Sequence, residues 1–536
     1  MTTRALLTVS VLSLSLLAGG CASTNGLSTQ ASLGDANALA AQKSLAGTPV
    51  ASASWPRSDW WTALGDAELD RLIEEALAGS PTLKVAAART RKALGLAETS
   101  KAALYPRVDA SYEATRERFP EHGLVPPPAA GAWSTVHQLQ ATLAWELDFW
   151  GKNRAAYESA LGEAKAAEVD AYAARLALSA NIAQAYVQLQ RAYLQLDVAQ
   201  TTLKEREQIF ALTRDRNAAG VDSRLELKQA ESALPATREQ IAQLNETIAL
   251  TRNRNAAGVD SRLELKQAES ALPATREQIA QLNETIALTR NQLAALLGQG
   301  PDRGLSIGRP DAHSLETVAL PASLPAELLG RRPDLVAQRA RVEAAQKEIA
   351  VAKAEFYPNV NLIAFIGLQS LGSAGFLSAA SRTLGVGPAI SLPIFEAGRL
   401  RGNLAGKNAD YDIAVESYNQ TLADALRDVV DNLASFRSVA EQRREQAQAL
   451  STAQEAYDLA LLRYREGIGN YLQVLSAEQP LLAQQSLDAD LKSREISLSI
   501  DLVRALGGGF DDSAIGGMTA PVAAIEQNRS VKDQNQ

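Results

Sequence analysis

Cysteine, histidine and aromatic residues are scarce in this chain of 536 residues. It has one cysteine, Cys21, and three scattered histidines, and aromatic side chains make up 5% of the sequence. A disulfide within the chain is therefore impossible, and these residues form no plausible set of zinc ligands. Nucleophile and phosphate-loop motifs are missing too, so the sequence predicts neither an enzyme nor a bound metal or cofactor.

An excess of positive charge is also missing. The chain has 53 Lys and Arg residues against 61 Asp and Glu residues, which gives a formal net charge of -8 at pH 7. A dense basic face that could offset phosphate charge is not expected, so no nucleic-acid partner is expected. Ala, Leu, Gln and Glu dominate long tracts instead, which is typical of long helices packed through small residues.

The N-terminus has the pattern of a lipoprotein signal. Arg4 supplies a positive charge, residues 5–17 form an apolar run too short to span a bilayer, and the small residues 18–20 directly precede Cys21. This resembles the bacterial lipoprotein box, in which the signal is cut before the cysteine and the thiol is lipidated. An ordinary signal peptide with a chance cysteine is the alternative. Ala22, in place of the Asp that usually marks inner-membrane retention, indicates the outer membrane.

The rest of the chain contains two copies of one unit. The spacing from Gly151 to Gly220 equals the spacing from Gly398 to Gly467, and the two pairs are related by a single offset in the numbering. Such self-similarity indicates an internal repeat. The predicted organisation is a signal peptide (1–20), a lipidated tether (21–54), a first repeat (55–323), a second repeat (324–510) and a flexible C-terminal tail (511–536).

A separate, perfect duplication lies inside the first repeat. Residues 216–253 reappear as residues 254–291, so this repeat alone is longer by the length of one copy. One extra helical pass of roughly 57 Å would reverse the direction of the chain. The insert is therefore expected either to lengthen both arms of a helical hairpin or to bulge out as a small side hairpin. A recent duplication or a sequence error without a selected role is the alternative.

The hydrophobic period changes from 3.6 to 2 in each repeat. Strands are predicted at about 104–118 and 133–150, and again at about 357–369 and 383–395, each pair joined by a loop and apolar on one face. Such strands are long enough to cross a bilayer, but four of them cannot close a membrane barrel. If they span, several chains must share one barrel. A small soluble sheet covered by helices is the alternative.

A long helical tract follows each pair of strands. Apolar residues recur every seven positions from Ile182 to Phe210, which predicts coiled-coil packing. Each tract is roughly 100 Å long and ends at a glycine turn, after which a second tract returns. The predicted helical hairpins occupy about 151–298 and 398–506.

A series of motifs covers about residues 55–510. They are Trp60-Trp61 with "LIEEAL", Tyr105-Pro106, "WELDFWG" (145–151), "LLGRRPDL" (328–335), "AEFYPNV" (354–360), "LPIFEAGR" (392–399), "RYREG" (463–467) and "RALGGG" (504–509). Together they resemble the TolC-like outer-membrane factors, in the lipoprotein (NodT-type) branch of tripartite efflux systems. The resemblance implies a mixed, mainly α fold with an internal two-fold repeat. In the implied homotrimer, long periplasmic helical hairpins form a coiled-coil α-barrel, and four transmembrane strands per chain contribute to a shared 12-stranded β-barrel.

The resemblance also implies a function. Such proteins do no chemistry and are passive exit ducts for small molecules, such as drugs or toxic compounds, across the periplasm and the outer membrane. Their implied partners are outer-membrane lipid, a periplasmic adaptor and an inner-membrane pump, here expected to be of the RND type. A duct for protein secretion (type I) and a lipid-anchored coiled-coil scaffold without a pore are the alternatives.

The tips of the helical hairpins hold the candidate gate residues. An acidic ring at the tunnel mouth would have to come from the aspartates that follow the tip glycines of the first repeat, although a solvated helix N-cap is the plainer interpretation of these aspartates. The candidate turn and gate residues are Gly220, Asp222, Gly258, Asp260, Arg463, Gly467 and Asn470, and the candidate lipid-attachment residue is Cys21. The charged run at 331–334 is expected to cap a helix rather than to catalyse a reaction.

Overall fold

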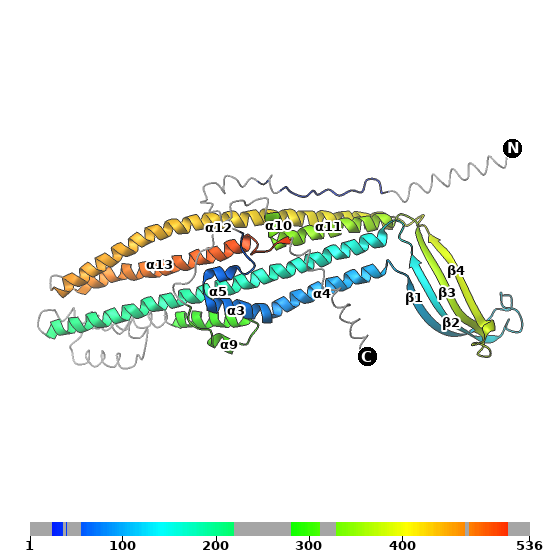
Figure 1. Ribbon diagram of the computed structural model, residues 1–536, viewed down its shortest axis with the longest axis horizontal. Helices are drawn as coiled ribbons and strands as arrows, with labels where there is room; N and C mark the ends of the chain where they lie inside the picture. Colours follow the sequence, from blue (N-terminus) through cyan, green and yellow to red (C-terminus); the bar gives the residue numbers. More distant parts are fainter. Residues whose placement is uncertain are drawn as a thin grey trace, which may run out of the picture. The chain divides into compact units, whose positions relative to one another are not determined.

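The computed structural model describes residues 24–35, 39, 55–218, 280–310, 328–466 and 471–512 (Figure 1). Its first half contains η1 (Trp60–Leu64), α3 (Ala67–Gly79), α4 (Pro81–Ala102), β1 (Arg107–Arg118), β2 (Trp133–Glu146), α5 (Lys152–Ala218) and α9 (Asp302–Leu305). Its second half contains α10 (Leu328–Arg331), α11 (Pro333–Ala354), β3 (Asn359–Leu371), η2 (Ala379–Ser381), β4 (Arg382–Ser391), α12 (Arg399–Arg465) and α13 (Tyr471–Ala505). The predicted fold class, mainly helical with a small antiparallel sheet, is confirmed. Among the described helices, none is both long and apolar enough to cross a membrane.

The chain divides into two compact units, and each unit takes segments from both halves of the sequence. The first consists of Met1–Asp35, Val85–Ala171 and Asp334–Leu422, and it contains the whole sheet. The second consists of Ala36–Lys84, Tyr172–Pro333 and Ala423–Gln536. The compact units therefore do not follow the boundary between the two repeats.

Matching helices of the two halves have equal lengths. Both α5 and α12 have 67 residues, and their first residues, Lys152 and Arg399, are related by the same offset as the glycines. Both α4 and α11 have 22 residues, but their first residues, Pro81 and Pro333, lie further apart than this offset allows. A single offset is thus wrong for the segment before the sheet. The offset between the two halves changes within the strand hairpins, because loops accept changes of length at little cost.

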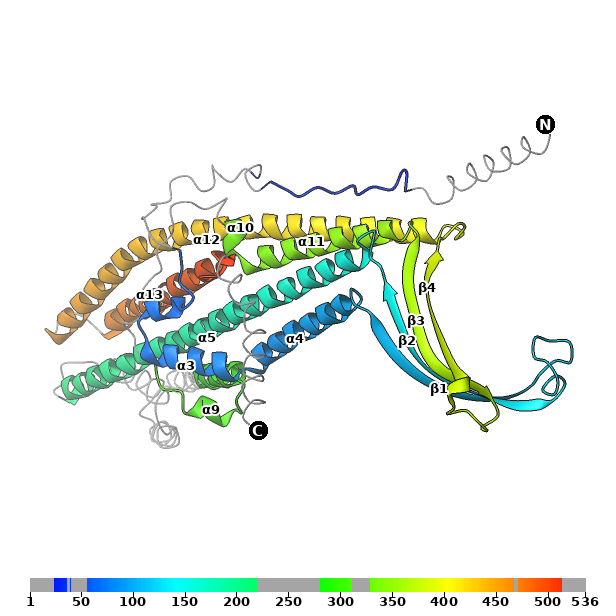
Figure 2. The same ribbon diagram turned by 45° about the vertical axis from the view of Figure 1, so that its right-hand side comes forward.

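The sheet has the strand order β1-β2-β3-β4, and every neighbouring pair is antiparallel (Figure 2). One row across all four strands runs from Tyr112 through Leu139 and Leu368 to Arg382. The middle pair, β2 and β3, joins the two halves of the sequence. Among the described residues β1 and β4 are the edges of the sheet, so each leaves one side of its backbone without a strand partner there.

Two strands end earlier than the sequence predicts. β2 stops at Glu146 rather than near residue 150, because the Asp148 carboxylate accepts the backbone N–H groups of Asn153 (3.1 Å) and Arg154 (2.8 Å) and so starts α5. β4 stops at Ser391 rather than near 395, where Pro393 has no N–H to donate to a neighbouring strand.

The core of the second compact unit is built around η1, α3 and the middle of α5. Trp60 and Trp61 are 4% exposed and pack with Ile182 and other buried apolar residues. Asp66 caps α3 by accepting the N–H groups of Glu68 and Leu69. Its second carboxylate oxygen accepts the hydroxyl of Tyr186 at 2.9 Å, which ties the cap to α5.

A turn of three glycines ends α13 within the second unit. Gly507, Gly508 and Gly509 have φ angles of +90°, +58° and +81°. A Cβ atom on Gly507 would lie 1.9 Å from the carbonyl oxygen of Arg331, and one on Gly509 would lie 2.1 Å from the carbonyl carbon of Arg57. Only glycine allows both this backbone conformation and this close approach, so the motif at 504–509 has a structural explanation.

The predicted capping role of the charged run at 331–334 agrees with its contacts. Pro333 begins α11, and Asp334 lies in its first turn. Arg332 is 8% exposed, donates to the carbonyl oxygen of Ala505 at 3.2 Å and forms an ion pair with Asp428 at 3.5 Å. Arg332 thus ties the start of α11 to the end of α13 and to the middle of α12.

Candidate functional site

The four strands separate an apolar from a polar face, because side chains alternate along each strand and the register places like residues in rows. The apolar face consists of Val108, Ala110, Tyr112, Ala114, His137, Leu139, Ala141, Leu143, Trp145, Leu362, Ala364, Ile366, Leu368, Leu384, Val386, Pro388 and Ile390. It is open to the outside in one chain: Val108 is 67% exposed, Leu384 77% and Ile390 68%. Such a face requires lipid or another apolar surface to cover it.

The opposite, polar face carries a chain of hydrogen bonds. The Gln138 amide donates to the Gln140 side-chain oxygen at 2.6 Å, and the Gln140 amide donates to the Thr142 hydroxyl at 3.0 Å. On β1 the carboxylates of Asp109 and Glu113 alternate onto this face. A face of this chemistry is suited to contact with water rather than lipid.

The polar face is less polar in the second half of the sheet. Ile363 and Phe365 alternate to this side, so apolar residues occupy both faces of β3. The Phe365 ring lies over Gly385, whose added Cβ would be 2.6 Å from the ring. The Phe365 ring thus packs against the backbone of Gly385, where a side chain would clash with it.

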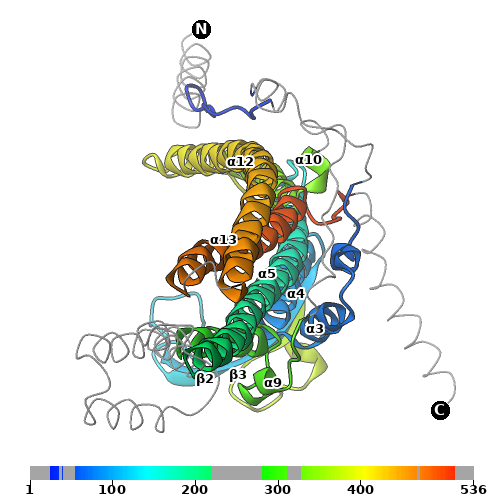
Figure 3. The same ribbon diagram turned by 90° about the vertical axis from the view of Figure 1, so that its left-hand side faces the viewer.

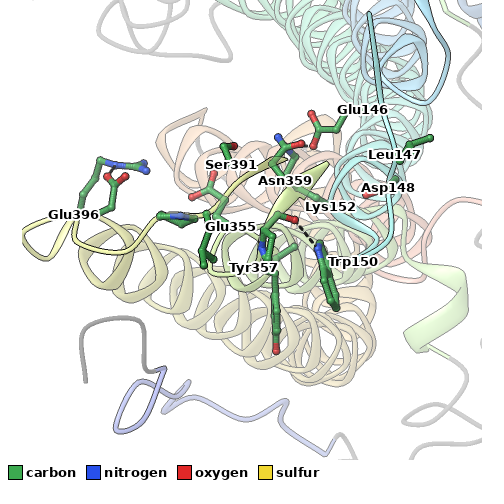
Figure 4. A pocket seen from close by; sticks show the side chains of 15 residues that line it. Glu146, Leu147, Asp148, Trp150, Lys152, Glu355, Tyr357, Asn359, Ser391 and Glu396 are labelled. Carbon is green, nitrogen blue, oxygen red and sulfur yellow. Dashed lines mark hydrogen bonds and ion pairs between the residues drawn. The ribbon is translucent and has the colours of Figure 1, made fainter. Parts of the chain in front are cut away.

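Trp150 and Tyr357 form a junction between the sheet and the helices. The Trp150 indole donates to the carbonyl oxygen of Pro358 at 2.7 Å, drawn as the dashed line in Figure 4. The rings of Trp150 and Tyr357 stack with centroids 4.7 Å apart and planes 20° apart. The end of the first hairpin is thereby fixed to the start of β3.

Charged side chains surround this junction and line a pocket of about 350 Å³. Lys152 forms an ion pair with Glu146, and Arg399 forms one with Glu396 at 2.6 Å. Each pair joins the first residue of a long helix, α5 or α12, to the segment that precedes it. The junction therefore stabilises the point at which strands change to helices.

The N-terminal segment 24–35 lies along α12, within the first compact unit. The Asp412 carboxylate accepts the backbone N–H of Gln30 at 2.9 Å, and the Asn419 side chain accepts the N–H of Gly34 at 2.7 Å and donates to the carbonyl oxygen of Ser32 at 3.1 Å. Asp412 and Asn419 are two helical turns apart, so they share one face of the helix. Neither residue could be recognised from the sequence, because only the folded chain brings them to a segment that is far away along the sequence.

The turn end of the second helical hairpin is held by a small apolar cluster. Tyr457, Tyr464, Val474 and Leu481 are buried between α12 and α13, which run side by side in Figure 3. The neighbouring Arg463 is exposed in the last turn of α12. Arg463 is therefore open to its surroundings in this chain.

Exposed apolar side chains near Arg463 were also missed. Leu459 and Leu462 are 58% and 53% exposed. Their i, i+3 spacing puts them on one side of the helix, and in the sequence this signal was hidden by the stronger heptad of the buried residues. The other predicted site residues lie outside the described residues: Cys21, Gly220, Asp222, Gly258, Asp260, Gly467 and Asn470.

Comparison with known proteins decides the family. The family model described as outer membrane efflux protein matches residues 72–246, 231–299 and 324–508. The chain belongs to the outer membrane efflux protein family. The first two matched ranges overlap at 231–246, inside the duplicated stretch.

Named relatives agree with this assignment. The chain is 37% identical to the fusaric acid resistance protein FusA of Burkholderia cepacia over 412 residues, 76% of this chain and 70% of FusA. It is 30% identical to the multidrug resistance outer membrane protein MdtP of Escherichia coli over 470 residues, 86% of this chain and 88% of MdtP. The crystal structure of the outer membrane protein VceC from Vibrio cholerae is 35% identical with a TM-score of 0.69, covering 85% of this chain and 100% of VceC. The predicted outer-membrane efflux component is therefore confirmed.

Proposed function

We propose that three copies of this efflux protein form the exit duct of a tripartite pump, and that small toxic organic compounds are its cargo. The names of the relatives support the cargo class, since they refer to resistance to fusaric acid and to multiple drugs. The duct is passive: its polar face provides a wet path, and the inner-membrane pump, of RND type, supplies the energy.

The observation that carries the trimer is the open sheet. Within the part of the chain that the structure describes, β1 and β4 have no strand partner on their outer sides, and the apolar face is exposed to the surroundings of the chain. About half of the 12 residues of β1 direct their N–H and C=O groups outward. In lipid each unpaired group costs several kcal/mol, so a lone chain would be disfavoured by tens of kcal/mol. Pairing β4 of one copy with β1 of the next removes this cost when three copies close a ring of twelve strands.

The turn ends of the helical hairpins are the proposed docking surface for a periplasmic adaptor. Arg463 is exposed there beside Leu459 and Leu462, a combination of apolar and charged side chains that suits a protein partner. The predicted gate aspartates, Asp222 and Asp260, belong to the same proposal and follow the tip glycines of the first repeat.

A lipid on Cys21 is the proposed second attachment to the membrane. The carbonyl oxygen of Asn25 accepts a hydrogen bond from Arg401, in the first turn of α12, at 3.2 Å. Cys21 lies only four positions before Asn25, so the chain can separate them by at most about 14 Å. A lipid on this thiol is thus within reach of the level where strands change to helices, which is where the inner leaflet ends.

The experiment for the exit duct is a complementation test. A strain deleted for this gene is compared with the same strain carrying the full chain, for susceptibility to a panel of toxic organic compounds and for accumulation of a fluorescent one. We expect the chain to restore resistance and lower accumulation, and purified protein to migrate as a trimer in native mass spectrometry. Restored secretion of a protein without restored resistance would favour the protein-secretion duct instead, and a monomer alone would contradict the shared sheet.

The lipid anchor is tested by metabolic labelling with a fatty acid. Wild-type protein is expected to take up the label and Cys21→Ser to lose it, because the chain has one thiol. Insertion should survive the substitution, since the apolar face of the sheet is far larger than one acyl anchor. A labelled Cys21→Ser protein, or an unlabelled wild type, would rule out the anchor.

A further inference from the structure

The apolar face of the sheet ends in arginines on its loop side. Arg116 and Arg118 continue the alternation of this face on β1, and Arg382 continues it on β4. From Val108 to Arg116, and likewise from Ile390 to Arg382, the strand advances by roughly 27 Å. At the usual tilt of membrane strands this is about 20 Å of height, close to that of an apolar membrane band. Both edge strands therefore end this face with a guanidinium group, and Arg382 lies in the row of Tyr112, four residues before Arg116 along β1.

The positive charge of these arginines is largely uncompensated. Across the described segments, Arg116 and Arg382 have no ion pair, and Arg118 pairs with Glu121 at 3.3 Å with both side chains more than half exposed. The carboxylates of Glu113 and Glu117 alternate to the polar face of the same strand. The loop-side rim of the apolar face therefore attracts anions, while the opposite face of β1 repels them.

Aromatic side chains lie next to this rim. The Tyr112 hydroxyl and the His137 Nδ1 atom are 2.9 Å apart, and the Phe376 ring lies 5.5 Å from the His137 ring and 6.0 Å from the Tyr112 ring. Trp133, opposite Arg118, is 64% exposed. Exposed amphipathic rings of this kind are characteristic of the level of lipid headgroups. Aromatic side chains thus share rows with the arginines: Trp133 lies opposite Arg118, and Tyr112 lies in the row of Arg382.

We propose that the arginines of this rim, the pair Arg116 and Arg118 on β1 and Arg382 on β4, bind the phosphate groups of the outer-leaflet glycolipid, a phosphorylated lipid of the lipid A type. A guanidinium group binds phosphate through two parallel charge-assisted hydrogen bonds, which neither lysine nor a neutral headgroup reproduces. The acyl chains of the same lipid cover the apolar residues below. The inference rests on the proposed insertion of the sheet: the helices occupy the periplasm, so the hairpin loops and this rim face the outer leaflet.

The test uses the full chain reconstituted into vesicles of phosphatidylethanolamine and phosphatidylglycerol, with or without lipid A. Bound lipid is counted by native mass spectrometry after release, and the temperature at which the oligomer dissociates is measured on gels. Bisphosphorylated lipid A is expected to remain bound and to raise that temperature, and monophosphorylated lipid A to do so less. In the triple variant Arg116→Gln, Arg118→Gln, Arg382→Gln we expect lipid A occupancy to fall at least about tenfold, the effect of losing one charge-assisted hydrogen bond.

Two controls make the outcome specific. Glu113→Gln with Glu117→Gln changes charge on the polar face of the same strand and should keep wild-type lipid A binding. Arg-to-Lys replacement at the three positions keeps the charge and should retain part of the lipid A binding. If the glutamine variant folds poorly, the lysine variant still tests the proposal. Equal binding of lipid A by wild type and the glutamine variant, or equal stabilisation by phosphatidylglycerol alone, would overturn the proposal. A protein that exports compounds but ignores lipid A would leave the proposed function standing, whereas failure to insert would contradict both.

Discussion

Gly507 offers a sharp test of the packing at the end of α13. In Gly507→Ala, the new Cβ would lie 1.9 Å from the carbonyl oxygen of Arg331 and 2.8 Å from its carbonyl carbon. The φ of +90° at this position also disfavours any residue with a side chain. The Arg331 carbonyl cannot retreat freely, because the next residue, Arg332, is 8% exposed and bonded to Ala505 and Asp428.

The expected cost is the sum of two effects. An unfavourable φ costs about 1–2 kcal/mol, and forcing a group into a filled site costs typically about 1–3 kcal/mol. Gly507→Ala should therefore destabilise the folded chain by roughly 2–5 kcal/mol, which corresponds to a drop of several degrees in the midpoint of thermal unfolding. Gly406→Ala is the matched control: Gly406 lies inside α12 with nothing within 4 Å of an added Cβ, so alanine should be neutral or stabilise by about 0.5–1 kcal/mol.

The assay is circular dichroism of the purified protein in detergent at one fixed heating rate, because unfolding of membrane assemblies is often irreversible. The amount of each variant in the outer membrane gives an independent measure. If both alanine variants melt at the same temperature as the wild type, the proposed close approach of Gly507 to Arg331 is wrong.

Further expectations concern a cap, a carboxyl group and the duplicated stretch. Asp66→Ala removes the cap of α3 and the carboxylate that accepts the Tyr186 hydroxyl, so it should cost about 2–4 kcal/mol, more than Tyr186→Phe. A control, Asp59→Ala, whose side chain is 42% exposed, should change the melting midpoint little, and the reverse order would refute the network. Burial raises the pKa of the Asp501 carboxyl above its ordinary value of 3.8, so the folded state binds a proton there more readily than the unfolded state. The stability that this proton contributes is lost as the pH rises from 3.8 through the raised pKa. Asp501→Asn should therefore have a higher melting midpoint than the wild type at pH 7, and this difference should shrink at acidic pH. A difference that does not change with pH would count against this expectation. Deletion of residues 216–253 should leave trimers and export intact at matched protein levels, whereas lost drug resistance would mean that the second copy is functional.

Local patterns in the sequence were sufficient to predict much of the architecture. The alternation around Tyr112 and Leu139 indicated strands with one apolar face, and the heptads through Ile182 and Leu189 indicated long packed helices. Both signals depend on side-chain direction over a few residues, which the period of the element alone determines. The cap at Asp66 could be predicted for the same reason, since it requires only its next neighbours along the chain.

Other features required the tertiary structure. The contact of Trp150 with Pro358, the docking of residues 30–34 on Asp412 and Asn419, and the glycine turn at Gly507 each join residues that are far apart in the sequence. No local period encodes which distant segment supplies the partner, because that choice depends on how the strands and helices pack in space. The register of the strands likewise decided that Arg116 and Arg382 end the same face. The sequence by itself thus determined which kinds of surface this protein has. Folding determined which distant residues lie together on each surface.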